Sequence, residues 1–202
     1  MSRENISMDE RLKMQMDFIR EVNKAKSVFR QTYLADGSRK ENDAEHSWHL
    51  AVMAFLLAEH AQEPVDVLKV VKMVLIHDLV EIDAGDTYAY DPSGNASKRE
   101  RELAGAQRIF HILPKDQADM LYDLWEEFEA RETPESKFAH TLDNCQPVLL
   151  NDASGGRSWK EHGVCAEQVM GRNQRTGEGS RAIWDYEKQI IEKNIRNGNI
   201  KE

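Results

Sequence analysis

The sequence has few of the features that would place it in a membrane or in an oxidising compartment. It has only two cysteines, Cys145 and Cys165, and no CxxC pair. The longest unbroken apolar run, 50–58, is nine residues long, whereas a helix that spans a bilayer needs roughly 20. The first five residues are polar and lack the apolar stretch of a signal peptide. We therefore expect a cytoplasmic protein with reduced thiols and no membrane partner.

The chain also lacks an excess of positive charge. It has 27 Lys and Arg against 36 Asp and Glu, a formal net charge of −9, and nucleic-acid binding requires a basic face. A small anionic substrate is still compatible with this charge, because a metal ion and one or two arginines can reverse the potential locally. There is no internal repeat, and no segment alternates at period two.

Helical periodicity recurs along the whole chain and predicts an all-α fold, a single compact helical bundle. The first helix is expected over 9–28, and its apolar side would consist of Leu12, Met16, Ile19 and Val22. Further helices are expected over 43–61, 65–85, 97–112, 114–131, 134–150 and 180–195. Asn42 or Asp43 would cap the second helix. Loops are expected at 88–96, 152–156 and 176–179.

His77 and Asp78 are polar residues inside the stretch 67–80, which is otherwise nearly all apolar. Apolar residues stand three, four and seven positions before His77, which places the imidazole on an apolar helix face. An imidazole and a carboxylate are costly there unless they are paired or bind a metal. Glu81 follows within one turn, so one helix surface can present all three groups.

Two more polar residues, His46 and Asp143, lie on apolar helices far away in the sequence. With His77 and Asp78 they make a set of two imidazoles and two carboxylates. This mixed set suits a six-coordinate divalent metal with open water positions. It points to metal-dependent hydrolysis.

The ordered set of His46, His77-Asp78-x-x-Glu81, Asp86 and Asp143 resembles the HD-domain metal-dependent phosphohydrolase superfamily, and within it the 5′-deoxynucleotidase branch. The matching stretches are 45–47, 76–86, 124–127 and 137–145. The resemblance implies one HD domain over 1–202, with a recognisable core at about 12–150. A C-terminal helical extension, 157–197, contributes little to the resemblance.

The resemblance also implies roles for individual residues. His46, His77, Asp78 and Asp143 would bind the metal. Glu81 would orient or deprotonate the attacking water, which a divalent metal makes acidic.

Substrate contacts are implied in the same way. Arg30, expected at the end of the first helix, would bind the phosphate, because a guanidinium fork matches phosphate oxygens. Asp86 would contact the sugar, and Thr87 would line the same pocket. Bacterial deoxynucleotidases follow the matching arginine with a tryptophan, whereas this chain has Gln31, so the sugar preference stays open. Lys137 is a second candidate for neutralising the phosphate charge.

The expected activity is release of phosphate from a (deoxy)nucleoside 5′-monophosphate by a homodimeric enzyme. The metal can be manganese, cobalt, magnesium, iron, nickel or zinc, because affinity order alone does not choose among them. The alternatives are hydrolysis of a nucleoside triphosphate or a cyclic phosphodiester, di-iron oxygenase chemistry, and a non-catalytic metal or nucleotide sensor. A sensor would be expected to lose Glu81 or Asp86, and both are present.

Overall fold

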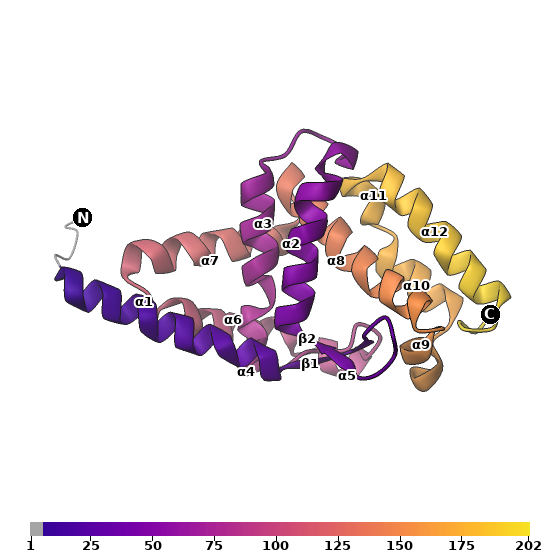
Figure 1. The fold of residues 1–202 in the computed structure, drawn as a ribbon, viewed down its shortest axis with the longest axis horizontal. Helices are drawn as coiled ribbons and strands as arrows, with labels where there is room; N and C mark the ends of the chain where they lie inside the picture. Colours follow the sequence, from indigo (N-terminus) through magenta and orange to yellow (C-terminus); the bar gives the residue numbers. More distant parts are fainter. Residues whose placement is uncertain (1–5) are drawn as a thin grey trace.

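The computed structural model describes residues 6–202 and consists almost entirely of helices (Figure 1). The α-helices are α1 (Met8–Val22), α2 (Asp43–Leu57), α3 (Val67–Ile76), α4 (Glu81–Ala84), α5 (Pro92–Asn95), α6 (Lys98–Phe110), α7 (Lys115–Ala130), α8 (Pro134–Ala153), α9 (Arg157–His162), α10 (Ala166–Asn173), α11 (Thr176–Gly179) and α12 (Arg181–Arg196). The 3-10 helices are η1 (Asn23–Ser27), η2 (Ala58–His60) and η3 (His77–Val80), and the strands are β1 (Phe29–Tyr33) and β2 (Lys40–Asn42). The expected all-α class is confirmed. Residues 1–5, on which the expectation of a missing signal peptide rests, lie outside the described residues.

Helices α2, α3 and α8 pack together in the middle of the molecule (Figure 1). Their shared core includes Leu50, Val70, Met73 and Leu142, which are fully buried. The four residues come from three helices, so burial of their apolar surface holds these helices together. The position of the metal-ligand candidates follows from this packing, because His46, Asp143 and the His-Asp pair stand on or directly after these helices.

Two further clusters lie on either side of this core. One is formed around Phe110 and Trp125 and joins α6 and α7 to η3. The other is formed around Trp159 and Ile191 and packs the C-terminal helices against α8. None of the helices in residues 6–202 combines the length and the apolar character needed to cross a membrane.

The apolar side predicted for α1 is largely exposed. Leu12, Met16 and Ile19 are 57%, 48% and 61% exposed, while Phe18 is buried. The reason is visible in Figure 1, where α1 extends away from the central helices toward the N-terminus. Little of the molecule covers that face, so most of the predicted apolar stripe lies outside the core.

The first helix ends earlier than predicted, and Arg30 stands on a strand. After Val22 the chain tightens into η1 and then forms β1, which pairs antiparallel with β2. Gly37 has φ of 69° in the connecting turn, a conformation that glycine adopts without strain. The hairpin was missed because β1 is short and mostly polar, so it shows no alternation of apolar residues.

The predicted third helix is divided at the His-Asp pair. Helix α3 ends at Ile76 and η3 follows. Helix α4 ends at Ala84 and is capped by Gly85, which has φ of 73°. Gly105 of α6 packs directly against the Val80 backbone at this point. The predicted loop at 176–179 is also wrong, because these residues form the helical turn α11, which packs on α8.

Candidate metal centre and active site

A capping box at the start of α2 fixes the position of His46. The Asn42 side chain accepts a hydrogen bond from the Glu45 amide at 3.0 Å, and the Glu45 side chain accepts one from the Asn42 amide at 3.3 Å. These bonds satisfy two amides that no helical carbonyl reaches. Asn42 as the cap is therefore confirmed, and it joins β2 to α2 at a rigid corner. His46 lies one turn further and is fully buried.

The four candidate metal ligands meet in space. Asp143 Oδ1 lies 3.1 Å from His46 Nε2 and 3.7 Å from His77 Nε2. Asp78 Oδ2 lies 3.1 Å from His77 Nε2 and 3.8 Å from His46 Nε2. The structure thus brings together residues from α2, η3 and α8, up to 97 positions apart in the sequence.

Hydrogen bonds on the far side of each ring define the imidazole tautomers. His46 Nδ1 lies 3.1 Å from the Gln146 amide oxygen, and His77 Nδ1 lies 2.9 Å from the Val74 carbonyl oxygen. Both oxygens only accept hydrogen bonds, so each Nδ1 carries the proton. The Gln146 amide is held in this orientation because its nitrogen donates to Glu41 at 2.7 Å. In its neutral form each ring therefore presents an Nε2 lone pair.

These Nε2 lone pairs face carboxylate oxygens, an arrangement that requires a cation or extra protons between them. Burial opposes protonation of His77, but Asp78 and Asp143 raise its pKa well above the ordinary value. The donor atoms of His46, His77 and Asp143 lie within 4.8 Å of one another. Imidazoles oriented by a second hydrogen bond are typical of metal ligands, so these residues fit a divalent cation.

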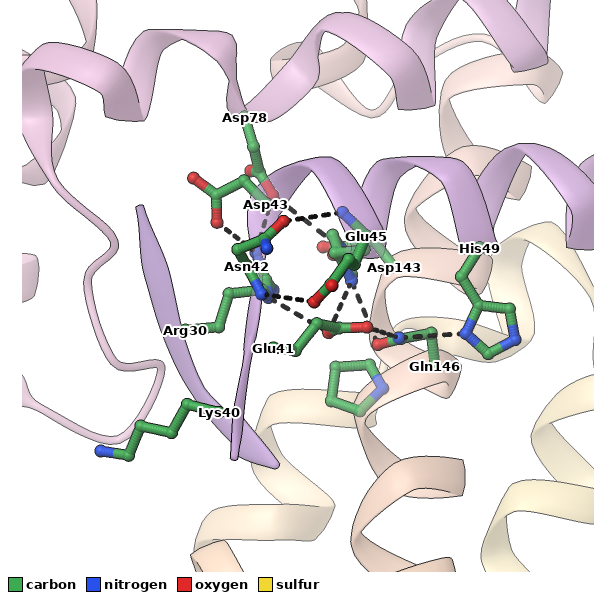
Figure 2. A network of polar contacts seen from close by, with 12 residues as sticks. Arg30, Lys40, Glu41, Asn42, Asp43, Glu45, His49, Asp78, Asp143 and Gln146 are labelled. Carbon is green, nitrogen blue, oxygen red and sulfur yellow. Dashed lines mark hydrogen bonds and ion pairs between the residues drawn. The ribbon is translucent and has the colours of Figure 1, made fainter. Parts of the chain in front are cut away.

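Arg30 lies among carboxylates on the other side of Asp78 (Figure 2). Its Nη1 is 2.7 Å from Asp78 and 3.7 Å from Asp43, and its Nε is 3.9 Å from Glu41. Burial disfavours the charged guanidinium, but the surrounding carboxylates raise the Arg30 pKa well above its ordinary value. Arg30 therefore holds Asp78 in place and is itself largely neutralised.

Asp43 is a buried acid that sequence reasoning missed. Burial and the charge of Asp78 raise its pKa to about 8, against the opposing effect of Arg30. Neither carboxylate oxygen has a hydrogen-bond partner within residues 6–202. Its position at the first residue of α2 made it resemble an ordinary capping residue. Donor atoms of Asp43, Asp78 and Glu81 also lie within 4.8 Å of one another.

Glu81 is buried one turn after the His-Asp pair. Burial and the charges of Asp78 and Asp86 raise its pKa well above the ordinary value, and Arg30 opposes the shift. Its Oε2 has no hydrogen-bond partner among the described residues. A partnerless carboxylate beside the ligands is suitably placed to accept a proton.

His77, Asp78 and Asp143 line a cavity of about 390 Å³, whereas the fully buried His46 is not part of its lining. Of the residues predicted from the sequence, the lining includes Arg30, His77, Asp78, Glu81, Asp86, Thr87 and Asp143. Lys137 is not part of the lining. It precedes Asp143 by six residues, which is about 240° around a helix, so it points to another side of α8.

Gly85 turns the chain over this cavity, as predicted. Its positive φ ends α4, and Asp86 and Thr87 follow along the wall. Arg101 fixes the turn by donating to the Thr87 hydroxyl at 2.8 Å and to the Ala84 carbonyl. Arg101, on α6, thus fixes the position of residues 84–87.

Several residues of the lining carried no recognisable signal in the sequence. They are Lys98, Glu102, Arg131, Asn144, Asn151, Arg172 and Asn173, together with Tyr90. Only the i, i+4 spacing of Lys98 and Glu102, which lie 3.3 Å apart, could have suggested a pair.

The chain belongs to the HD domain family, which matches residues 22–184. The resemblance found in the sequence is therefore confirmed. A crystal structure described as a predicted metal-dependent phosphohydrolase from Magnetospirillum magnetotacticum MS-1 is 47% identical, with a TM-score of 0.92, and the match covers 98% of this chain and 100% of that one. A conserved hypothetical protein from Pyrococcus furiosus shares the fold at 22% identity and a TM-score of 0.60, over 90% of this chain and 99% of that one.

Curated relatives are similar over a shorter stretch. The 5′-deoxynucleotidase HDDC2 of Homo sapiens is 31% identical over 135 residues, which are 66% of this chain and 65% of that protein. The protein of the same name from Bos taurus is 32% identical over 136 residues, 66% of this chain and 64% of that protein. The match thus spans slightly less than two thirds of these relatives' own length.

Proposed function

We propose that this protein is a metal-dependent phosphomonoesterase that releases phosphate from (deoxy)nucleoside 5′-monophosphates. The observation that carries the proposal is the pair of imidazole Nε2 atoms facing Asp78 and Asp143 beside the buried carboxylate of Glu81. The names of the relatives support it, since two are 5′-deoxynucleotidases and one is a predicted metal-dependent phosphohydrolase.

In this proposal His46, His77, Asp78 and Asp143 hold one divalent cation. When bound, such a cation polarises the phosphoryl group and lowers the pKa of a water molecule. Two imidazoles and two carboxylates accept manganese, cobalt, iron, nickel or zinc. Magnesium prefers oxygen ligands, so it would be bound mainly by the two carboxylates.

Glu81 accepts a proton from the attacking water, because it lines the cavity and its Oε2 has no hydrogen-bond partner among the described residues. Asp43 also lacks hydrogen-bond partners there, but it is not part of the cavity lining. Asp86 and Thr87 contact the substrate from one wall, with Arg30 beside them. Tyr88 and Tyr90 offer aromatic surface for a base. The cavity volume of about 390 Å³ lies within the range of about 300–1,000 Å³ typical of small-molecule sites.

The role of Glu81 is tested by Glu81→Gln, which preserves the shape of the side chain. We expect bound metal to stay stoichiometric while turnover falls by about 10²-fold or more, the range of general-base catalysis. Glu126→Gln is the matched control, because Glu126 lies outside the cavity lining and pairs with Arg99 at 2.8 Å. Turnover of the Glu81 variant equal to that of the control would contradict the assignment.

The substrate class is tested by phosphate release from a panel of ribo- and deoxyribonucleoside monophosphates. Metal-stripped protein is resupplied with manganese, cobalt, magnesium, iron, nickel or zinc in separate assays. We expect release that depends on metal. Stoichiometric metal without release from any substrate of the panel would refute the proposal.

We also propose that the chain forms a homodimer in the cytoplasm. Leu12, Met16 and Ile19 recur at spacings of four and three residues on the exposed face of α1, so two copies can share this stripe across a twofold axis. Cys145 and Cys165 are unpaired, as expected in a reducing compartment. Light scattering should give the mass of two chains, and the mass of one chain would exclude the dimer.

A further inference from the structure

The cavity has a second basic corner, which no prediction from the sequence included. Arg131 reaches it from the end of α7, and Arg172 reaches it from α10. Arg172 Nη2 lies 3.5 Å from Asp143 Oδ2. The other oxygen of this carboxylate, Oδ1, is the one that faces His46. A group bound by Arg172 would therefore lie beside the candidate metal ligands.

Arg131 feels the charges of Asp143 and Glu129, but no carboxylate lies close enough to form an ion pair with it in the described part of the chain. Its guanidinium makes no hydrogen bond and no ion pair within residues 6–202, although the side chain is partly buried. Burial and the positive charge of Arg172 lower the Arg131 pKa, and the carboxylates of Asp143 and Glu129 oppose this shift. An anion bound beside the two arginines would stabilise both charges.

The backbone of Arg131 is also unusual. With φ of 54° and ψ of 38°, it is the one non-glycine residue with positive φ among those described. Glycine is the common residue at this position after a helix, because a side chain is strained in the left-handed region. The chain thus has an arginine, facing the cavity, where a glycine would be favoured for folding.

Arg30 lines the same cavity, but its surroundings are negatively charged. Arg30 contacts three carboxylates, those of Asp78, Asp43 and Glu41. A phosphate dianion placed against Arg30 would also meet this negative charge. Beside Arg131 and Arg172 the phosphate would meet two guanidinium groups. Of these, only Arg172 forms an ion pair within the described residues, the 3.5 Å contact with Asp143.

We propose that Arg131 and Arg172 bind the phosphoryl group of the substrate and the phosphate that leaves as product, while Arg30 acts by positioning Asp78. The inference rests on the proposed function, which supplies the phosphoryl group. The planar guanidinium suits it, because its paired donors match two phosphate oxygens.

The test measures binding of inorganic phosphate to the manganese-loaded protein by calorimetry, independently of turnover. Arg131→Gln and Arg172→Gln should each weaken binding by about 10-fold or more, the effect of losing a hydrogen bond to a charged group. Arg175→Gln is the matched control, because Arg175 is exposed and pairs with Glu178 at 2.8 Å outside the cavity. It should bind phosphate within twofold of the unchanged protein.

Metal content and thermal unfolding of each variant show whether the centre is intact. If Arg172→Gln loses metal or does not fold, Arg172→Lys keeps the charge beside Asp143 without the paired donors. It should still weaken phosphate binding by several-fold.

The outcomes separate this inference from the proposed function. Arginine-dependent phosphate binding without hydrolysis of any nucleotide would remove the proposed activity and leave the phosphate site in place. Hydrolysis by the unchanged protein, together with phosphate binding by both glutamine variants equal to that of Arg175→Gln, would overturn the inference. Absence of phosphate binding by the unchanged, metal-loaded protein would overturn it as well.

Discussion

Gly105 determines how closely α6 approaches the turn that carries His77 and Asp78. A Cβ atom at position 105 would lie 2.6 Å from the Val80 carbonyl oxygen and 3.4 Å from the Val80 carbonyl carbon and Cα. The first distance is shorter than real contacts of this kind, and the atoms are backbone, so no side-chain rotation relieves the clash. Gly105→Ala should therefore force α6 and η3 apart.

Two opposing effects determine the size of the change. Alanine stabilises a helix interior by about 1 kcal/mol relative to glycine, whereas overpacking costs about 1–3 kcal/mol. The clash with fixed backbone favours the upper part of that range, so we expect a net destabilisation of about 1–2 kcal/mol. Gly171→Ala is the control, since no atom lies within 4 Å of the added Cβ. It should stabilise the protein by about 0.5–1 kcal/mol.

The assay is thermal unfolding with and without manganese. In a protein of this size 1 kcal/mol corresponds to about 2–4 °C in Tm, so the two alanine variants should shift Tm in opposite directions. Gly105→Ala should also bind manganese more weakly, because the His77–Val80 turn moves. If Gly105→Ala raised Tm as much as Gly171→Ala does, the close approach of α6 to η3 would be refuted.

Two further predictions concern Arg131 and Glu187. Arg131→Gly removes a left-handed strain of about 1 kcal/mol, so Tm should rise by about 2–4 °C while phosphate binding weakens; a fall in Tm would contradict the strain. Burial raises the pKa of Glu187 from 4.5 to about 8, against the charge of Arg172. The folded chain thus keeps a proton that the unfolded chain releases, and stability of at most about 5 kcal/mol is lost as pH rises from about 4.5 to about 8. Glu187→Gln should flatten this dependence in unfolding titrations, and an unchanged slope would count against it.

Local patterns predicted the helices well where capping and periodicity agree. The ranges 97–112 and 114–131 correspond to α6 and α7 within two residues at each end. Proline, glycine and capping side chains act through neighbouring backbone groups, so their effect can be read from a few adjacent letters.

The same locality explains the errors. An apolar stripe on α1 shows that one face can pack, but whether anything covers it depends on residues far away in the sequence. The β1–β2 hairpin was missed for a related reason, because its pairing and its contact with α2 stabilise strands that are too polar to alternate.

The residues of the candidate site fall into two groups, those that the local sequence marks as unusual and those that only the tertiary packing identifies. His46, His77, Asp78 and Asp143 could be predicted because each is a polar residue on an apolar helix, where burial makes an unpaired group costly. Asp43, Arg131 and Arg172 stand at helix ends, where charged residues are ordinary. Only the packing of α7 and α10 around α8 shows that the two arginines face the cavity.

The meeting of His46 and Asp143 across 97 positions gives the centre a mechanical role. A cation bound there would act as a removable cross-link that closes a long loop, and the entropy of that closure would favour the folded chain. Without the cation, the buried carboxylates repel one another, and fewer interactions keep the two ends of the loop together. Treatment with a chelator should then expose the chain to proteases, so the supply of metal in a cell would influence how long each molecule persists as well as how fast it works.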